Sequence, residues 1–219
     1  VWLYFRFPLS LRMVEELLAA RGIEATYETV RCWALKFGTA IARCIRSNAP
    51  ACCDKWHLDE VVVTINGRRH WLWRAVDQHG ATLDVLVQCR RDRYAARRLM
   101  RKPMKKQGRV PCVLVTDKLR SYAAANRDLG LDLDHRQHKG LNNRAENSHQ
   151  PTRVREKVMR RFKSARHLQR FASTHDQVAN LFMHSRHNRD AAAKRAARSR
   201  AFAAWGRASG ARSFGVAAM

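Results

Sequence analysis

The stretch from Trp56 to Ile65, followed by Asn66-Gly67, constrains the fold of this chain more than any other. Residues 61–63 and Ile65 are β-branched and suit the pleated surface of a strand. Asn-Gly is the strongest short-range signal for a two-residue hairpin, because both central positions need a positive φ. We therefore predict a strand over 56–65 that folds straight back into a second strand over 68–76.

One carboxylate interrupts the apolar part of this first strand. Asp59 is costly to bury unless it is paired or bound to a metal. Glu60 beside it should point to the opposite face of the strand, so it is the weaker candidate for a shared site. Asp77 and Asp84, on the strands that follow, also compete as site carboxylates.

The remaining pattern predicts three more strands and several helices. A third strand over 81–89 completes an antiparallel meander, and a helix over 93–107 should kink or end at Pro103. The wholly apolar run 112–116 reads as a buried parallel strand. A helix over 119–129, a fifth strand over 131–137, a helix beginning near Arg144 and a long amphipathic helix through 168–182 follow. This order is that of the ribonuclease H-like α/β fold, a mixed five-stranded sheet with flanking helices.

Two amphipathic helices precede the strands, within residues 9–47. Ser10 and Thr26 are good N-caps, and Gly22 ends the first helix. The pair predicts an all-α helix-turn-helix, whose second helix would offer Thr29, Arg31 and Lys36 to DNA. An ordinary helical hairpin without DNA contact fits the same pattern. We predict three regions: a helix-turn-helix over 1–50, a catalytic domain over 51–185 and a basic tail over 186–219.

The charge of the chain favours a nucleic-acid partner. It has 43 Lys and Arg against 18 Asp and Glu, a formal net charge of +25. Its six cysteines form no CxxC pair, so we expect reduced thiols rather than a structural zinc. No apolar run is long enough for a membrane helix. From about residue 187 the chain is rich in Ala, Arg and Ser, which predicts a frayed or disordered tail.

Three carboxylates could meet in the predicted fold. Asp59 lies on the first strand, Asp117 ends the fourth, and Glu146 lies on the helix after the fifth. Carboxylates this close repel one another unless cations intervene, and hard oxygen ligands favour Mg²⁺ or Mn²⁺. Two such ions would suit phosphodiester chemistry. Each residue alone also fits a structural role, as an edge carboxylate, a turn residue or a helix-dipole partner.

Five segments together resemble bacterial insertion-sequence transposases of the IS-six (IS6-like) family of DDE enzymes, over about residues 1–185. The most specific of them is Asn142-Asn143-x-x-Glu146 with the trailing Phe162-Lys-Ser164. The other segments are Trp56-His-Leu-Asp59-Glu60, Trp73-Arg-Ala-Val-Asp77, Val115-Thr-Asp117-Lys118 and His135-Arg-Gln-His-Lys-Gly-Leu-Asn.

The resemblance implies that Asp59, Asp117 and Glu146 are the DDE triad of a ribonuclease H-like catalytic domain. It implies cleavage and strand transfer at terminal inverted repeats, cointegrate formation, an oligomeric enzyme and a bacterial, cytoplasmic, nucleoid-associated location. Only 28 residues separate Asp117 from Glu146, fewer than the mid-thirties common in the family. The family usually has residues before the point where this chain begins, so we expect a truncated copy.

Basic residues flank the three carboxylates in the sequence, and we expect them to contact DNA phosphates. A solvated basic surface explains each of them equally well. Two other functions also fit: a ribonuclease H-like nuclease that only hydrolyses DNA, and an inactive relic that only binds it. The flanking residues are Lys118, Arg136, His138, Lys139 and Arg144.

Overall fold

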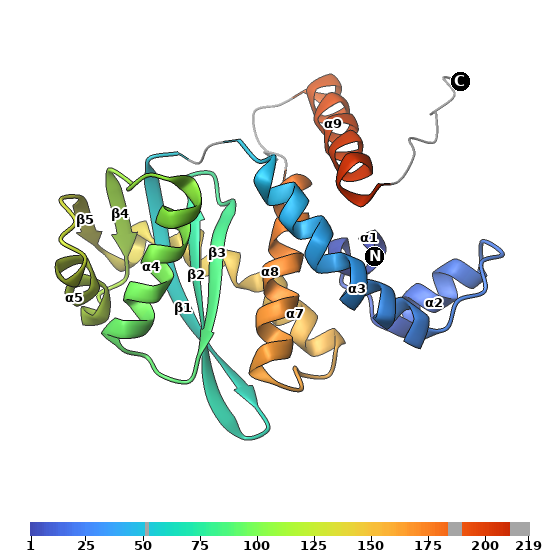
Figure 1. The fold of residues 1–219 in the computed structure, drawn as a ribbon, viewed down its shortest axis with the longest axis horizontal. Coiled ribbons are helices and arrows are strands. Elements are labelled where there is room, and N and C mark those ends of the chain that lie inside the picture. Colours follow the sequence, from blue (N-terminus) through green and yellow to red (C-terminus); the bar gives the residue numbers. More distant parts are fainter. Residues whose placement is uncertain (51–52, 184–189, 211–219) are drawn as a thin grey trace. The chain divides into compact units, whose positions relative to one another are not determined.

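The computed structural model describes residues 1–50, 53–183 and 190–210, which form two compact units (Figure 1). One unit is Pro50–Ser173 and contains all the strands of the described chain. The other joins Val1–Ala49 to Thr174–Met219. No helix in the described ranges is both long enough and apolar enough to cross a membrane.

A mixed five-stranded sheet forms the centre of the Pro50–Ser173 unit. Strands β1 (Lys55–Ile65), β2 (Arg68–Asp77) and β3 (Thr82–Gln88) make the predicted antiparallel meander. Strand β4 (Val113–Thr116) pairs in parallel with β1, and β5 (Asp134–Gln137) pairs in parallel with β4. The order β3-β2-β1-β4-β5 is the predicted ribonuclease H-like arrangement.

Alternation along β1 gives the sheet two different faces. Trp56 and Leu58 belong to a buried core with Trp73 and Tyr122, whose rings meet edge to face at 5.6 Å. Helix α4 (Arg93–Gln107) packs on β2 and β3 at this core, and α5 (Arg120–Asp128) packs on α4. Pro103 is buried inside α4, which continues to Gln107 and does not end there.

Helices α6 (Asn143–Ser148) and α7 (Gln150–Val158) follow β5 and a short 3-10 turn over Lys139–Leu141. Asn142 donates a side-chain hydrogen bond of 2.8 Å to the Leu58 carbonyl at the start of α6. At the other end, Arg74 from β2 donates to the Ser148 carbonyl and, at 2.8 Å, to the Thr152 hydroxyl. These bonds hold α6 against the sheet, on the face where Asp59 points.

Helix α8 (Ala165–Leu181) is the predicted long amphipathic helix. Its Gln169 accepts the Val87 N–H at 2.7 Å and donates to the Val85 carbonyl at 3.1 Å, so it satisfies the outer edge of β3. Two non-glycine residues with positive φ, Arg160 at 50° and Arg161 at 74°, separate α7 from α8.

The other unit begins with α1 (Trp2–Arg6), α2 (Leu11–Ala19) and α3 (Tyr27–Ser47). The predicted caps form: the Ser10 side chain accepts from the Met13 N–H and the Thr26 side chain from the Thr29 N–H. Helices α2 and α3 pack together, joined by residues 20–26.

The prediction of a frayed or disordered tail from about residue 187 is wrong over α9 (Ala191–Ser209). Alanine is the strongest helix former, and the Asp190 side chain caps the helix by accepting the Ala193 N–H at 2.6 Å. Phe202 packs on Trp2 and Phe182 at centroid distances of 5.3 and 5.1 Å, and these contacts anchor the helix. Residues 186–189 and 211–219 of the predicted tail lie outside the described ranges.

Candidate active site

The candidate site lies where β4 ends beside β1. The last residues paired between these parallel strands are Leu58 and Thr116, and each is followed by an aspartate. Neighbouring strands run about 4.8 Å apart, so this register brings Asp59 and Asp117 side by side. Because β4 stops here, β1 has an open edge at the carboxyl end of the parallel strands, where ligands collect in α/β sheets.

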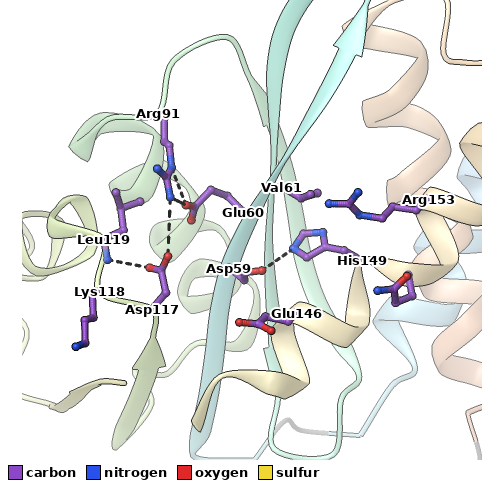
Figure 2. Close-up of a pocket in the computed structure, with 11 residues that line it drawn as sticks. Asp59, Glu60, Val61, Arg91, Asp117, Lys118, Leu119, Glu146, His149 and Arg153 are labelled. Atoms are coloured by element: carbon purple, nitrogen blue, oxygen red, sulfur yellow. Dashed lines mark hydrogen bonds and ion pairs between the residues drawn. The ribbon is translucent and has the colours of Figure 1, made fainter. Parts of the chain in front are cut away.

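A cavity of about 920 Å³ opens at this edge (Figure 2). It collects side chains from β1, from the segments that follow β3 and β4, and from α6 and α7 with His149 between them. All three predicted triad residues line it, together with the basic residues Arg91, Lys118 and Arg153. The lining residues are Asp59, Glu60, Val61, Arg91, Asp117, Lys118, Leu119, Glu146, His149, Gln150 and Arg153.

The surroundings of Asp59 disfavour its charged form. Its side chain is 14% exposed, and a histidine nitrogen, Nε2 of His149, lies 3.4 Å from its Oδ2. Burial, and then the neighbouring charge of Asp117, raise the pKa of Asp59 to about 6. The backbone N–H of Glu60 and the charge of Arg91 oppose this rise. A free carboxylate is therefore unfavourable here unless a cation offsets it.

Glu60 points to the opposite face from Asp59, as predicted, yet it lines the same cavity because the open edge of β1 joins the two faces. Its Oε2 accepts a 2.6 Å hydrogen bond from the Tyr122 hydroxyl, and its Oε1 accepts from Arg91. Burial raises the pKa of Glu60 to about 7, and the bonds from Tyr122 and Arg91 oppose that rise.

Asp117 and Glu146 complete the set from different elements. One oxygen of Asp117 accepts the Leu119 N–H at 2.9 Å, and the other lies 3.9 Å from Nη2 of Arg91. Glu146 lies in the first turn of α6, half-buried, and lines the cavity below Asp59 in Figure 2.

The donor set is rich in carboxylate oxygen, which suits Mg²⁺ or Mn²⁺. Within the described ranges, no three His, Cys, Asp or Glu side chains are grouped closely enough to hold a metal ion. The observation that fits a cation is the facing pair Asp59 and Asp117, whose mutual repulsion contributes to the raised pKa of Asp59.

The competing carboxylates have structural roles. Asp77 accepts the backbone N–H groups of His79 and Ala81 in the β2–β3 turn. Asp84 pairs with two lysines of α4, Lys102 and Lys106. Neither aspartate lines the cavity.

The basic residues predicted from sequence are dispersed. Lys118 lines the cavity, whereas Arg136 pairs with its neighbour Asp134, and His138 and Arg144 are exposed away from the cavity lining. The side chain of Lys139 lies outside what the structure describes. On α3, the Arg31 side chain pairs with Glu28, Lys36 lies 5.4 Å from the centroid of the Phe37 ring, and the Thr29 hydroxyl bonds to that of Thr26.

Sequence reasoning missed four polar side chains of the cavity: Arg91, His149, Gln150 and Arg153. His149 and Arg153 follow Glu146 by three and seven residues, a helical spacing that could have identified them. Arg91 carries no such signal, because only the path of β3 brings it near Asp117.

This chain is similar in sequence to a known protein family and to characterised relatives. A family model described as a DDE domain, that of IS240-type transposases, matches residues 53–185. The transposase of insertion sequence element IS257 in transposon Tn4003 of Staphylococcus aureus is 30% identical over 157 residues, which cover 69% of this chain and 70% of that protein. The transposase of the IS431mec element of the same organism matches to the same extent.

Among solved structures, the HTLV-2 integrase catalytic core domain in complex with magnesium, in its dimeric form, has a TM-score of 0.39 and 12% identity. The match covers 65% of this chain and 92% of that chain. The trimeric form has a TM-score of 0.36 and 16% identity, over 45% and 68% of the two chains. These structural similarities are distant. The family match and the sequence relatives establish that this chain belongs to the IS6-like family of DDE transposases.

Proposed function

We propose that this chain cuts and joins DNA at the ends of an insertion sequence, with formation of a cointegrate. The observation that carries the proposal is that Asp59, Asp117 and Glu146 line one cavity at the carboxyl end of β4. They come from three elements separated widely in sequence, and two of them repel each other there.

We propose that these three carboxylates hold two Mg²⁺ ions, which Mn²⁺ could replace. When bound, such ions activate an attacking oxygen and stabilise a leaving oxygen in phosphodiester chemistry. The chain itself supplies the negative charge: the side chain of Asp59 is only 14% exposed, and a cation would offset its repulsion from Asp117. Glu146 would have to move towards this pair, because in the described ranges no three His, Cys, Asp or Glu side chains are grouped closely enough to hold a metal ion.

The proposed substrate is double-stranded DNA, first the terminal inverted repeats and then a target, in the bacterial nucleoid. Lys118 and Arg153 are exposed in the cavity and would contact phosphates beside the carboxylates. Arg136, His138, Lys139 and Arg144 would extend this contact, and Thr29, Arg31 and Lys36 of α3 would read the repeat. We assign end binding to the region 1–50 and catalysis to 51–185, in a homo-oligomer.

The test uses labelled end DNA, a target plasmid and Mg²⁺ with the full chain. Asp59→Asn and Glu146→Gln should each abolish strand transfer and leave binding of the end DNA intact. Asp132→Asn, at an exposed aspartate outside the cavity, is the matched control and should retain activity. Strand transfer by either site variant would remove the carboxylate assignment.

The same assay separates the other functions. Cleavage of the end without joining to the plasmid would identify a hydrolytic nuclease. Binding that is unaffected by Mg²⁺, with neither cleavage nor joining, would identify a DNA-binding relic.

A further inference from the structure

Arg91 occupies a fixed place in the cavity that its sequence position does not suggest. It lies between the end of β3 and Asp92, the residue that caps α4. Its Nε and Nη2 both donate to Oε1 of Glu60, at 2.8 and 2.6 Å. The same Nη2 lies 3.9 Å from Oδ2 of Asp117 (Figure 2). The guanidinium is thus directly beside a proposed metal ligand.

The guanidinium of Arg91 is held on the protein side by Glu60, Tyr122 and Trp71. The Glu60 side chain is fully buried, and the hydroxyl of Tyr122, also fully buried, donates to its second oxygen at 2.6 Å. The Trp71 ring lies against Arg91 with its centroid 4.8 Å from Cζ. Because both oxygens of Glu60 are engaged, the carboxylate cannot rotate freely, and the plane of the guanidinium is fixed with it.

The front of Arg91 remains available to a ligand. Its side chain is 39% exposed and lines the cavity. Within the described part of the chain, its Nη1 makes no hydrogen bond. Arginine presents its donors as a planar fork, so one edge can bind a carboxylate while another binds a phosphate.

A phosphodiester entering this cavity meets several carboxylates, and its charge must be offset by cations. Lys118 and Arg153 are exposed cations on flexible stems, whereas Arg91 is held in one orientation before DNA arrives. A donor that is already oriented loses less conformational freedom when it binds. Packing of the protein interior does not by itself require the Glu60–Arg91 ion pair. An apolar residue at position 60 would fill the same space without needing a cation.

We propose that Arg91 contacts a phosphate oxygen of the DNA strand in the active site, and that Glu60 and Tyr122 are positioning residues that aim it. This inference rests on the proposed function, since it takes the cavity to be the place where DNA is cut.

The first experiment compares Arg91→Gln with Arg90→Gln in the full chain. Arg90 is the exposed neighbour, lies outside the cavity lining and carries the same charge. The probe is a labelled duplex of about 40 base pairs spanning one end of the DNA element that carries this reading frame. Arg91→Gln should weaken binding and slow cleavage, together by roughly ten- to a hundredfold, as expected for one charge-assisted hydrogen bond. Arg90→Gln should leave cleavage within about twofold of wild type.

The double variant Arg91→Gln with Glu60→Gln distinguishes two roles of Arg91: contact with a DNA phosphate, and neutralisation of the Glu60 charge. Arg91→Gln leaves the buried carboxylate with Tyr122 but without its cation, so the unfolding midpoint should fall. Adding Glu60→Gln removes that buried charge while its amide carbonyl still accepts from Tyr122, so the midpoint should recover. If Arg91 contacts DNA, cleavage and binding should stay impaired in the double variant.

Recovery of both cleavage and the unfolding midpoint in the double variant would overturn the inference, because Arg91 would then act only as a counter-ion for Glu60.

Arg91→Lys should be partly impaired, since a single ammonium cannot hold Glu60 with two N–H groups and reach a phosphate as well. A wild-type chain that binds the duplex but does not cut it would refute the proposed function. The binding comparison between the Arg91 and Arg90 variants would still test the contact.

Discussion

Asp59 is the residue at which the chemistry of this site conflicts most directly with the stability of the fold. Its pKa rises to about 6 from an ordinary value near 3.8, because burial and Asp117 disfavour its charge. The folded state therefore holds a proton that the unfolded state releases as the pH rises from about 4 to 6. Over this interval the carboxyl group makes the fold less stable, and above about pH 6 the whole penalty is present.

Asp59→Asn should therefore stabilise the metal-free protein at neutral pH. We expect the free energy of unfolding to rise by about 1–3 kcal/mol at pH 7.5 and to change little at pH 4. Urea unfolding in the presence of a chelator, at both pH values, measures the difference. Asp132→Asn, at an exposed site, should give no gain at either pH. An equal gain at pH 4 and 7.5 would show that ionisation of Asp59 is not the cause.

Single residues also mark how far sequence reasoning reaches. Asp59 and Asp117 could be chosen from sequence because Asp59 interrupts an apolar strand and Asp117 follows one, and these strands fix their places in the sheet. The role of Glu60 could be predicted only in part, because strand alternation gives its face but not the open edge that brings it back to the cavity. Arg91 could not be chosen at all, since its contacts with Glu60 and Asp117 span 31 and 26 residues and depend on how β3 ends.

At the scale of elements, periodicity and caps predicted the strands and most helices. The five-residue helix α1 is too short to show a period. The break between α7 and α8 has no Gly or Pro to signal it, because the residues with positive φ are Arg160 and Arg161. The helix α9 was missed because an Ala-rich segment has few large apolar residues. Its buried residues are Ala197 and Ala201, and Phe202 contacts the rings of Trp2 and Phe182.

The position of the short helix α6 decides where Glu146 lies. Asn142 is fully buried and ties the start of this helix to the Leu58 carbonyl, next to Asp59. Asn142→Ala should lower the free energy of unfolding by about 1–3 kcal/mol, since the carbonyl loses a buried partner. It should also reduce strand transfer more than it reduces DNA binding, since Glu146 loses its fixed position.

The matched control for this helix is Asn143→Ala, at the adjacent exposed asparagine. It should change the free energy of unfolding by less than about 0.5 kcal/mol. Chemical denaturation and the strand-transfer assay measure both variants. Strand transfer at the wild-type rate by Asn142→Ala would mean that the hydrogen bond to β1 does not position Glu146.

At the scale of the whole molecule, the dominant property is a formal net charge of +25. A surface this basic must release many counterions when it covers DNA. The logarithm of the binding constant should therefore fall linearly with the logarithm of the salt concentration. If the chain contacts 6–10 phosphates, affinity should fall by about a thousandfold or more between roughly 50 and 200 mM salt.

Fluorescence anisotropy with a labelled duplex measures this dependence. The inactive variants Asp59→Asn and Glu146→Gln should keep the same slope, because the slope counts phosphate contacts and the carboxylates make none. Arg91→Gln should lower the slope by about 0.9, the loss of one contact. A slope near zero for the wild-type chain would mean that its positive charge does not engage the DNA backbone, and the phosphate contacts proposed around the cavity would then have to be withdrawn.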